Sequence, residues 1–273
     1  MKIVIPSHKR SDRVIPLTWI PESFSNNTYI AVRSGEQADV YSAAHGKRVN
    51  HNIIAFDNLN GIGDKRNAIA RYFAGEKIWM IDDDCTLHNA TLNEEKNRIM
   101  MDATRTVNET EFYECISYIT DLLDKYPLGS VRPAIFPKGK ESWPYAINKW
   151  TFTNAFLNLG VVNADLLQYN KYPLLEDLCA FLNTIHAGYD TVSLSKWMFK
   201  TAKPGKPGGI TEFRTAQITA EVSKKIHEEF PQYTYWAKGF KLKGYDDSTE
   251  DRPLVLGVKI PPRKTHTTNV LPL

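Results

Sequence analysis

Three consecutive carboxylates, Asp82, Asp83 and Asp84, are the residues of this sequence whose types and spacing most directly imply chemistry. They follow an apolar run, residues 78–81, that has the composition of a buried strand. Three adjacent acids repel one another unless a cation or solvent neutralises them. Mg²⁺ and Mn²⁺ prefer oxygen ligands and commonly use one or two carboxylates together with phosphate oxygens. The triplet therefore indicates a divalent metal ion that bridges to a substrate diphosphate, with a solvated acidic turn as the alternative.

Two basic segments in the first third of the chain are candidates for binding phosphate. Residues 6–13 form a cationic loop after a predicted strand, and such side chains pair with phosphate oxygens. Gly61 and Gly63 precede a predicted helix, where glycine lets the backbone approach a phosphate closely. Lys65 and Arg66 lie in the first turn of that helix, where cations oppose the helix dipole unless an anion is bound. The third glycine of a dinucleotide-binding fingerprint is absent, and a solvated basic surface remains the alternative for both segments.

The elements that must position these groups alternate between strands and helices. Such alternation predicts an α/β fold with a mostly parallel central sheet flanked by helices, in which ligands bind at the carboxyl ends of the strands. Strands are expected at residues 1–5, 29–32, 52–56, 78–81, 130–136 and 255–260, with a further short strand after Gly188 and strands or a bend within 150–162. Helices are expected at residues 36–45, 64–73, 111–126, 176–187 and 215–230.

A second acidic pair, Glu176 and Asp177, begins the predicted helix that Gly188 ends. Acids at a helix amino terminus stabilise the helix dipole by about 0.3–1 kcal/mol, which is a sufficient structural explanation. A role in proton transfer is the functional alternative.

The bulk composition fits an ordinary globular protein. The chain has 273 residues, of which 42% are hydrophobic, so it can form one large α/β domain or two small ones. Its three cysteines lack metal-binding spacing and are odd in number, which favours a reducing compartment. No segment has the length of a signal sequence or a membrane span, so we expect a cytoplasmic protein without a membrane partner.

The last quarter of the chain concentrates basic and aromatic residues, although the net charge is only +3. A segment rich in proline and glycine, 203–209, carries two lysines, and residues 233–245 interleave aromatics with cations. This pattern suits neutralisation of phosphates combined with base stacking, and a half-buried strand would look similar. Enzymes that modify a base often flip it out of the duplex, and aromatic side chains can support that step. The candidate DNA-binding residues are Lys203, Lys206, Trp236, Lys238, Lys241 and Lys243.

Four segments, taken in order, resemble a known family. They are Pro6-Ser7 after the first strand, Arg33-Ser34-Gly35 after the second, Gly-x-Gly-Asp-Lys-Arg-Asn from Gly61, and Asp-Asp-Asp after a strand. This order resembles the nucleotide-sugar glycosyltransferases of the A-type (GT-A) fold. Within that fold the sequence is most similar to the phage TET-associated glycosyltransferases, which act on hydroxymethylated or oxidised pyrimidines in DNA. The resemblance covers roughly residues 1 to 200.

The resemblance implies roles for individual residues. Asp82 and Asp84 would bind Mn²⁺ or Mg²⁺ as an Asp-x-Asp signature, and His266 is the candidate for a late histidine ligand. Asp177 would be the base of an inverting reaction, with Glu176 as its positioning partner, whereas a retaining reaction needs no such base. The pocket for the nucleotide sugar would be lined by Pro6, Ser7, Arg10, Arg33, Gly61, Gly63, Lys65, Arg66, Asp82 and Asp83.

These observations lead to one expectation with three alternatives. We expect a metal-dependent glycosyltransferase that moves glucose or arabinose from a UDP-sugar to the hydroxyl of 5-hydroxymethylcytosine in double-stranded phage DNA. Residues 1–200 would form the catalytic core of a monomer, and residues 201–273 a basic extension that packs on the core and contacts the acceptor. The alternatives are a glycosyltransferase for a surface glycan or small molecule, a nucleotidyltransferase, and a DNA-binding protein with a degenerate sugar-nucleotide domain.

Overall fold

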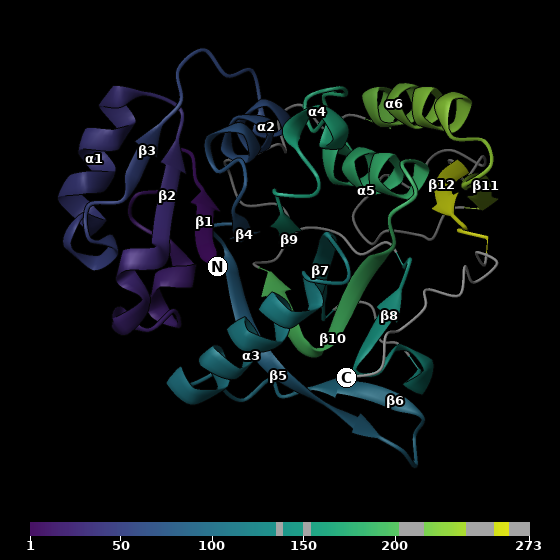
Figure 1. Ribbon diagram of the computed structural model, residues 1–273, viewed down its shortest axis with the longest axis horizontal. Helices are drawn as coiled ribbons and strands as arrows, with labels where there is room; N and C mark the ends of the chain where they lie inside the picture. The colour runs from purple at the N-terminus through teal and green to yellow at the C-terminus, as the bar shows by residue number, and fades with distance from the viewer. Residues whose placement is uncertain (135–138, 150–153, 202–215, 239–253, 262–273) are drawn as a thin grey trace.

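The protein is a three-layer α/β structure, seen here in a computed structural model that describes residues 1–134, 139–149, 154–201, 216–238 and 254–261 (Figure 1). Within these residues a ten-stranded sheet has the order β3-β2-β1-β4-β9-β7-β10-β5-β6, with β8 paired to β10. One apolar cluster on the sheet includes residues of α1 and α3, and the other includes residues of α2, α4, α5 and α6. The predicted α/β fold is therefore confirmed.

The first half of the sheet is parallel. It consists of β1 (Lys2–Pro6), β2 (Thr28–Val32), β3 (Ile53–Ala55) and β4 (Lys77–Met80). β1 pairs in parallel with both β2 and β4, and β3 adds to β2. α1 (Gly35–His45) and α2 (Ile62–Tyr72) connect these strands. The carboxyl ends of β1, β2 and β4 consequently meet at one edge, as the strand and helix predictions require.

The second half of the sheet contains antiparallel strands, but β7 and β10 run in the same direction as β4. β9 (Ala155–Asn158) runs antiparallel to both β4 and β7 (Leu128–Pro133), so β7 runs in the same direction as β4. β10 (Thr191–Thr201) is parallel to β7, and β5 (Cys85–Asn93) is antiparallel to β10. The remaining strands of the sheet are β6 (Arg98–Met101) and β8 (Tyr145–Ile147). Most of the central sheet is thus parallel in direction, as predicted.

Four strands differ from the sequence expectations, since β5, β6 and β8 were not expected and β10 is longer than expected. β5 begins at Cys85, directly after the acidic triplet, and with β6 forms a hairpin that projects from the body of the protein (Figure 1). β5 contains polar residues such as His88 and Asn89, so it lacks the run of apolar residues by which the other strands were predicted. β10 is not a short strand after Gly188 but an 11-residue strand, with a shift of register between Leu194 and Met198.

The helices of the second half pack through apolar stripes. α3 (Glu109–Leu122) begins with a capping box formed by Asn108 and Glu111. α5 (Glu176–His186) and α6 (Ala216–Glu229) contribute buried side chains to the same apolar cluster, among them Leu178 and Ile226. The other elements are α4 (Ala164–Leu167), the 3₁₀ turns Ile15–Thr18, Glu22–Asn27, Lys47–Val49 and Lys140–Ser142, and a two-stranded ribbon of β11 (Thr234–Lys238) and β12 (Leu254–Val258).

Two further observations bear on the chemical environment. The three cysteines, Cys85, Cys115 and Cys179, are all buried and free. Among the helices that the structure describes, none combines the length and the apolar character needed to cross a lipid bilayer.

Candidate active site

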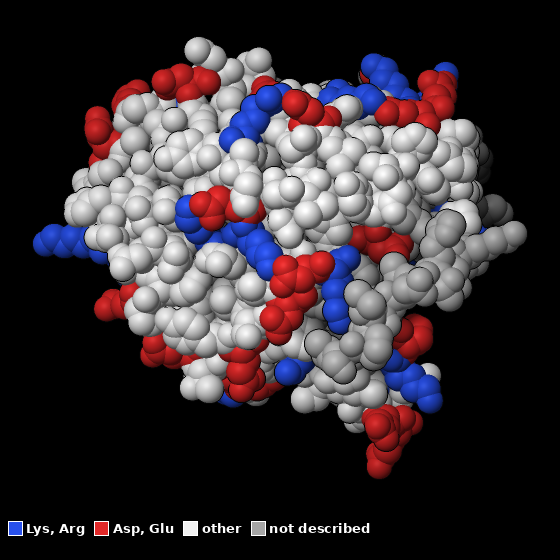
Figure 2. All heavy atoms as spheres, viewed as in Figure 1, with Lys and Arg blue, Asp and Glu red and all other residues white. Residues whose placement is uncertain are grey.

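The candidate site forms where β1, β2 and β4 end. Pro6 is the last residue of β1, Arg33 follows β2, and the acidic triplet follows β4 by one residue. The Ser7 amide donates to the Ala31 carbonyl and extends the pairing of β1 with β2 beyond the strand. Lys, Arg, Asp and Glu side chains gather in a band across the middle of the face shown in Figure 2. The sequence-predicted residues of the first ninety positions are therefore brought together.

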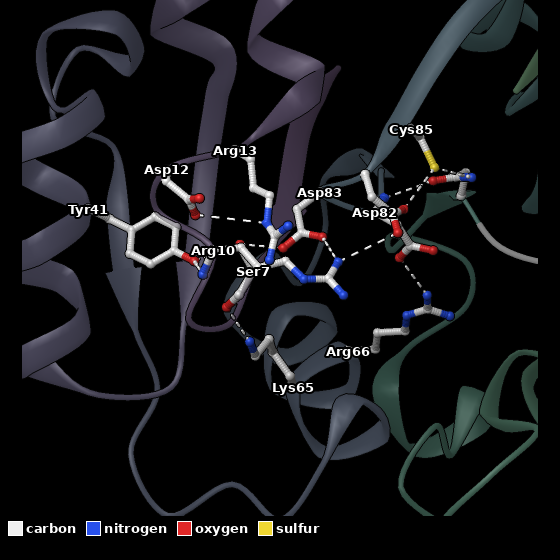
Figure 3. A network of polar contacts seen from close by, with 12 residues as sticks. Ser7, Arg10, Asp12, Arg13, Tyr41, Lys65, Arg66, Asp82, Asp83 and Cys85 are labelled. Atoms are coloured by element: carbon white, nitrogen blue, oxygen red, sulfur yellow. Dashed lines mark hydrogen bonds and ion pairs between the residues drawn. The ribbon is translucent and has the colours of Figure 1, made fainter. Parts of the chain in front are cut away.

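Asp83 is the buried member of the triplet and joins the β1 loop to the end of β4. Its carboxylate accepts hydrogen bonds from Ser7 Oγ at 2.5 Å and from Arg10 Nη1 at 2.7 Å (Figure 3). Ser7 Oγ also lies 2.8 Å from the hydroxyl of Tyr41, which accepts from the Arg10 amide at 2.9 Å. Hydrogen bonds thus link Ser7, Arg10, Tyr41 and Asp83 to one another, and such a network makes this part of the site rigid before any ligand binds.

Asp82 points to the opposite side, toward α2 and α5 (Figure 3). Arg66 Nη2 donates to Asp82 Oδ1 at 2.9 Å, and Arg66 Nη1 lies 3.2 Å from Glu176 Oε1. Burial acts to lower the pKa of Arg66, but the charges of Asp82, Glu176 and Asp177 outweigh it and raise that pKa. Burial raises the pKa of Glu176, and Arg66 opposes this. Arg66 therefore couples the metal-signature acid to the acidic pair of α5, which the sequence did not predict.

Asp84 is the most accessible acid of the triplet, with 36% of its side chain exposed. Arg10 Nη1 lies 3.5 Å from Asp84 Oδ2. Burial and the charges of Asp82 and Asp83 raise the pKa of Asp84. Asp84 also borders a cavity of about 340 Å³ whose other lining residues are Ile15, Thr86, His88, Thr104, Arg105, Thr106, Lys200 and Thr201.

The donor chemistry of the triplet fits a hard divalent cation. Burial and the neighbouring charges of Asp82 and Asp83 raise the pKa of Asp84, and a bound cation would favour its ionised form. Among the described residues no group of three or more His, Cys, Asp or Glu side chains is arranged as a metal site. Asp82 and Asp84 with phosphate oxygens would be a sufficient set for Mg²⁺ or Mn²⁺. The proposed ligand His266 lies outside the described residues.

The glycine-bearing loop packs closely against α4 and β1. A Cβ on Gly63 would lie 2.3 Å from the Tyr169 carbonyl oxygen, so only glycine fits there, whereas Gly61 has no such neighbour. Lys65 is buried and donates through Nζ to the Ser7 carbonyl at 2.6 Å. Burial, with a smaller contribution from Arg33, lowers the pKa of Lys65 to about 7. Lys65 is therefore held beneath the β1 loop and is not a free surface cation.

The amino end of α5 carries backbone strain beside the acidic pair. Leu175, the residue before Glu176, has φ 60° and ψ 33°, a left-handed conformation that is rare for a bulky residue and is typical of functional sites. Glu176 is turned inward to Arg66, as described above. Asp177 Oδ1 accepts from the Leu178 amide at 2.9 Å, and Asp177 lines a cavity of about 30 Å³ with Ser130 and Tyr169. That cavity has room for a water molecule.

The predicted DNA-binding residues are only partly placed. Trp236, on β11, is 37% exposed, its neighbour Tyr235 is 47% exposed, and Lys238 is the last residue of that strand. Lys203, Lys206, Lys241 and Lys243 lie outside the described residues.

Two residues of the site, Tyr41 and Asn154, and one buried arginine of β7 escaped sequence reasoning. Tyr41 lies on α1, far from any motif, and reaches the site only through the fold. Asn154 accepts from the Asp82 amide through Oδ1 at 2.8 Å, and its left-handed backbone (φ 58°) is one that asparagine tolerates. Arg132 is a fully buried cation in β7, and an arginine within a predicted strand was the available signal.

Comparison with known proteins identifies the family of the chain. The profile of the TET-Associated Glycosyltransferase family matches residues 1–209. The chain is 34% identical over 256 residues to the beta-glucosyl-HMC-alpha-glucosyl-transferase of Enterobacteria phage T6, covering 93% of this chain and 90% of the relative. It is 34% identical over 238 residues to the enzyme of the same name from Enterobacteria phage T2, covering 86% and 83%.

Solved structures resemble the chain only distantly. A glucose-1-phosphate thymidylyltransferase from Bacillus anthracis has a TM-score of 0.38 and 12% identity, over 74% of this chain and 89% of that one. UDP-glucose pyrophosphorylase complexed with UDP-glucose has a TM-score of 0.37 and 13% identity, over 74% and 91%. Likenesses at this level carry no conclusion about function. The sequence relationships do, and they establish that this chain is a glycosyltransferase that belongs to the TET-associated glycosyltransferase family.

Proposed function

We propose that the protein transfers a sugar from a UDP-linked donor to the hydroxyl of 5-hydroxymethylcytosine in phage DNA, in the cytoplasm of the host. The observation that carries the proposal is the acidic triplet at the edge where β1, β2 and β4 end, in a chain whose phage relatives are named for glucosyl transfer to an HMC-linked acceptor. Ligands of parallel α/β sheets bind at this edge.

Binding of the donor would use groups that already lie at that edge. Asp82 and Asp84 would hold Mg²⁺ or Mn²⁺, which when bound offsets charge on the departing diphosphate. Lys65 and Arg10 would add positive charge beside it, and Asp83, fixed by Ser7, would contact the ribose or the sugar. The bond from the anomeric carbon to the diphosphate oxygen breaks, and a bond from that carbon to the acceptor oxygen forms.

The fate of the acceptor proton depends on the stereochemistry. In an inverting reaction Asp177 would accept the proton, and its place beside a small cavity lined by Ser130 and Tyr169 leaves room next to its carboxylate. In a retaining reaction the departing diphosphate would accept the proton, and Asp177 would only orient the acceptor. Glu176 is held by Arg66 in either case, so we assign it a positioning role.

A second acceptor is favoured by a specific observation. The relatives from phages T6 and T2 are named for alpha-glucosyl transfer to beta-glucosyl-HMC, an acceptor that already carries a sugar. With an alpha-linked donor, formation of an alpha linkage retains configuration, which removes the need for a base. The acceptor of this chain would then be a sugar hydroxyl, while the donor site would be unchanged.

Contacts to the acceptor DNA would come from the region after residue 200. Tyr235 and Trp236 are exposed aromatic side chains on β11, which suits stacking with bases. Lys203, Lys206, Lys238, Lys241 and Lys243 would neutralise phosphates. We propose that this region packs on the 1–200 core of a monomer as its acceptor-binding extension.

Mass spectrometry of nucleosides tests the proposal. DNA containing 5-hydroxymethylcytosine, glucosylated DNA and unmodified DNA are each incubated with the protein, Mn²⁺ or Mg²⁺, and a panel of nucleotide sugars. We expect a mass gain of one hexose or one pentose on one of the two modified DNAs and none on unmodified DNA. Hydrolysis of a donor without a gain on any DNA would move the acceptor to a glycan or small molecule. Release of pyrophosphate instead of a nucleoside diphosphate would indicate a nucleotidyltransferase.

A further inference from the structure

Arg132 is a buried cation with most of its hydrogen-bonding capacity unused. It lies near the carboxyl end of β7 and is 0% exposed. Its Nη2 donates to Ser193 Oγ at 3.0 Å, whereas Nε and Nη1 have no hydrogen-bond partner. No carboxylate of the described residues forms an ion pair with it. Its one hydrogen-bond partner is thus a neutral hydroxyl, and this leaves the positive charge without a direct counter-ion.

Such an arrangement lowers the stability of the ligand-free protein. Burial lowers the pKa of Arg132 to about 10, although the charge of Glu141 opposes this. A buried donor without a partner costs roughly 1–3 kcal/mol, and a charged group costs more. Ser195 lies in the β10 bulge, where the register with β7 shifts between Val131 and Arg132. Its Oγ is also buried without a hydrogen-bond partner. A functional role is one explanation for an unsatisfied buried group in a native protein.

The sheet register places Arg132 on the acceptor side of the site. Alternation along β7 puts Ser130 and Arg132 on the same face, with Arg132 two residues nearer the carboxyl edge. Ser130 lines the small cavity with Asp177 and pairs in register with Ser193, the partner of Arg132. β7 runs in the same direction as β4, so Arg132 and Asp82 lie at the same edge of the sheet.

We propose that Arg132 binds a backbone phosphate of the acceptor polynucleotide. This rests on the proposed function for the identity of the acceptor, but not on the chemistry of transfer. A phosphate supplies the direct ion-pair partner that no described residue provides to Arg132, and its oxygens accept hydrogen bonds from guanidinium N–H groups. Arg132 is buried in the ligand-free protein, so the proposal requires that its guanidinium group become accessible when the polynucleotide binds.

The position of Arg132 favours the acceptor over the diphosphate of the donor. β7 is separated from β1 by β4 and β9, which amounts to about 14 Å at the usual strand spacing. The donor-side cation Lys65 donates to the Ser7 carbonyl under the β1 loop, whereas Arg132 contacts Ser193 on β10, whose register partner Ser130 lines the Asp177 cavity. A strand of DNA that presents its target hydroxyl to the site would carry its flanking phosphates past this part of the edge.

The test compares wild-type protein with Arg132→Met, which keeps an unbranched, apolar stem and removes the guanidinium group with its charge. Binding of a modified oligonucleotide is measured by fluorescence anisotropy over a range of salt concentrations, and binding of UDP by calorimetry. We expect an affinity for the oligonucleotide about tenfold lower, a plot of log K against log salt concentration that is shallower by about 1, and an unchanged affinity for UDP. We also expect a higher midpoint of thermal unfolding, because the unpaired charge is gone.

Arg48→Met is the matched control. Arg48 also has an unpartnered Nη1, but its Nη2 donates to the carbonyls of Leu17 and Ile20. We expect this variant to unfold at a lower temperature and to keep the wild-type salt dependence. The proposal is overturned if Arg132→Met binds the oligonucleotide with the wild-type salt slope, if it loses affinity for UDP instead, or if it is destabilised as Arg48→Met is. Sugar transfer can persist in all these cases, so the proposed function would survive such a result.

Discussion

The two sides of the active-site edge differ in how far their polar groups are satisfied. On the donor side Asp83 accepts from Ser7 and Arg10, and Lys65 donates to the Ser7 carbonyl. Arg132 Nε and Nη1 in β7 and the Tyr169 hydroxyl beside the Asp177 cavity have no hydrogen-bond partner. Two buried atoms of α2, Arg66 Nε and Asn67 Oδ1, also have none. A satisfied network is rigid, whereas an unsatisfied one gains its partners from a ligand. The comparison favours our proposals that the Asp83 loop is formed before the donor binds and that Arg132 gains its partner from the acceptor.

The largest effect is expected from Asp84→Asn. This change removes one of the two proposed metal-binding charges, so sugar transfer should fall by about 10³-fold or more. The midpoint of thermal unfolding should stay the same or rise, because the charges of Asp82 and Asp83 oppose ionisation of Asp84. Mass spectrometry of DNA nucleosides measures transfer, and Asp12→Asn, at a side chain that is 76% exposed, is the control. Full transfer by Asp84→Asn would rule out the metal assignment.

Arg66→Met should have the opposite effect on stability to Arg132→Met. Arg66 is paired with two acids, and its removal leaves Asp82 and the buried Glu176 without their counter-ion. Breaking a buried pair in this way costs about 3–5 kcal/mol. Urea unfolding measures the loss, and Arg71→Met on the same helix, at an exposed ion pair with Asp165, should be nearly neutral. A gain in stability for Arg66→Met would remove the contrast between the two sides.

The pKa of Lys65 makes binding of the donor sensitive to pH. Its value of about 7 in the folded protein lies below the ordinary 10.5, so the buried charge costs stability below pH 7 and the cost is relieved as pH rises toward 10.5. If protonated Lys65 attracts the diphosphate, affinity for UDP-glucose in Mg²⁺ should fall by up to about tenfold per pH unit above pH 7. Calorimetry at pH 6.5 and 8.5 measures this fall. Lys65→Met should bind weakly at both values, and an equal pH dependence in that variant would exclude Lys65 as the cause.

A smaller loss is expected from Ser7→Ala. The change leaves Asp83 with Arg10 as its remaining side-chain donor and removes the Ser7 partner of the Tyr41 hydroxyl. The free energy of unfolding should fall by about 1–3 kcal/mol. Ser23→Ala, which removes an exposed hydrogen bond to Glu109, serves as the control in the same urea titration and should change little. Equal effects of the two changes would mean that the donor network contributes no special stability.

The sequence was most informative where local pattern determines structure. The parallel strands β1, β2 and β4 are short apolar runs with covered faces, and each was predicted within a few residues. The acidic triplet and the loop at Gly61 follow predicted elements, so their convergence at one edge followed from the topology. β5 was missed because its polar residues pack against β10 and loop 102–106, as His88 does through the carbonyls of Asp102 and Arg105.

The partners of the site residues could not be predicted from pattern. Arg66 was expected to contact a phosphate. In the structure it forms ion pairs with Asp82 and with Glu176, and Glu176 lies 110 residues further along the chain. Tyr41 reaches Ser7 only because α1 packs beside β1 and β2. Contacts of this kind depend on how several helices and strands pack against one another, and local sequence patterns do not reveal that packing.

Release of UDP from UDP-glucose, with and without modified DNA, tests the contrast between the two sides most directly. Three proteins are compared, the wild type, Asp84→Asn and Arg132→Met. A preformed donor site predicts slow hydrolysis without DNA that is equal in the wild type and Arg132→Met and lost in Asp84→Asn. DNA-stimulated release should be lost in Asp84→Asn, and in Arg132→Met it should require a DNA concentration about tenfold higher. If Arg132→Met lost hydrolysis together with DNA-stimulated release, Arg132 would belong to the donor site and the proposed division of the edge would be wrong.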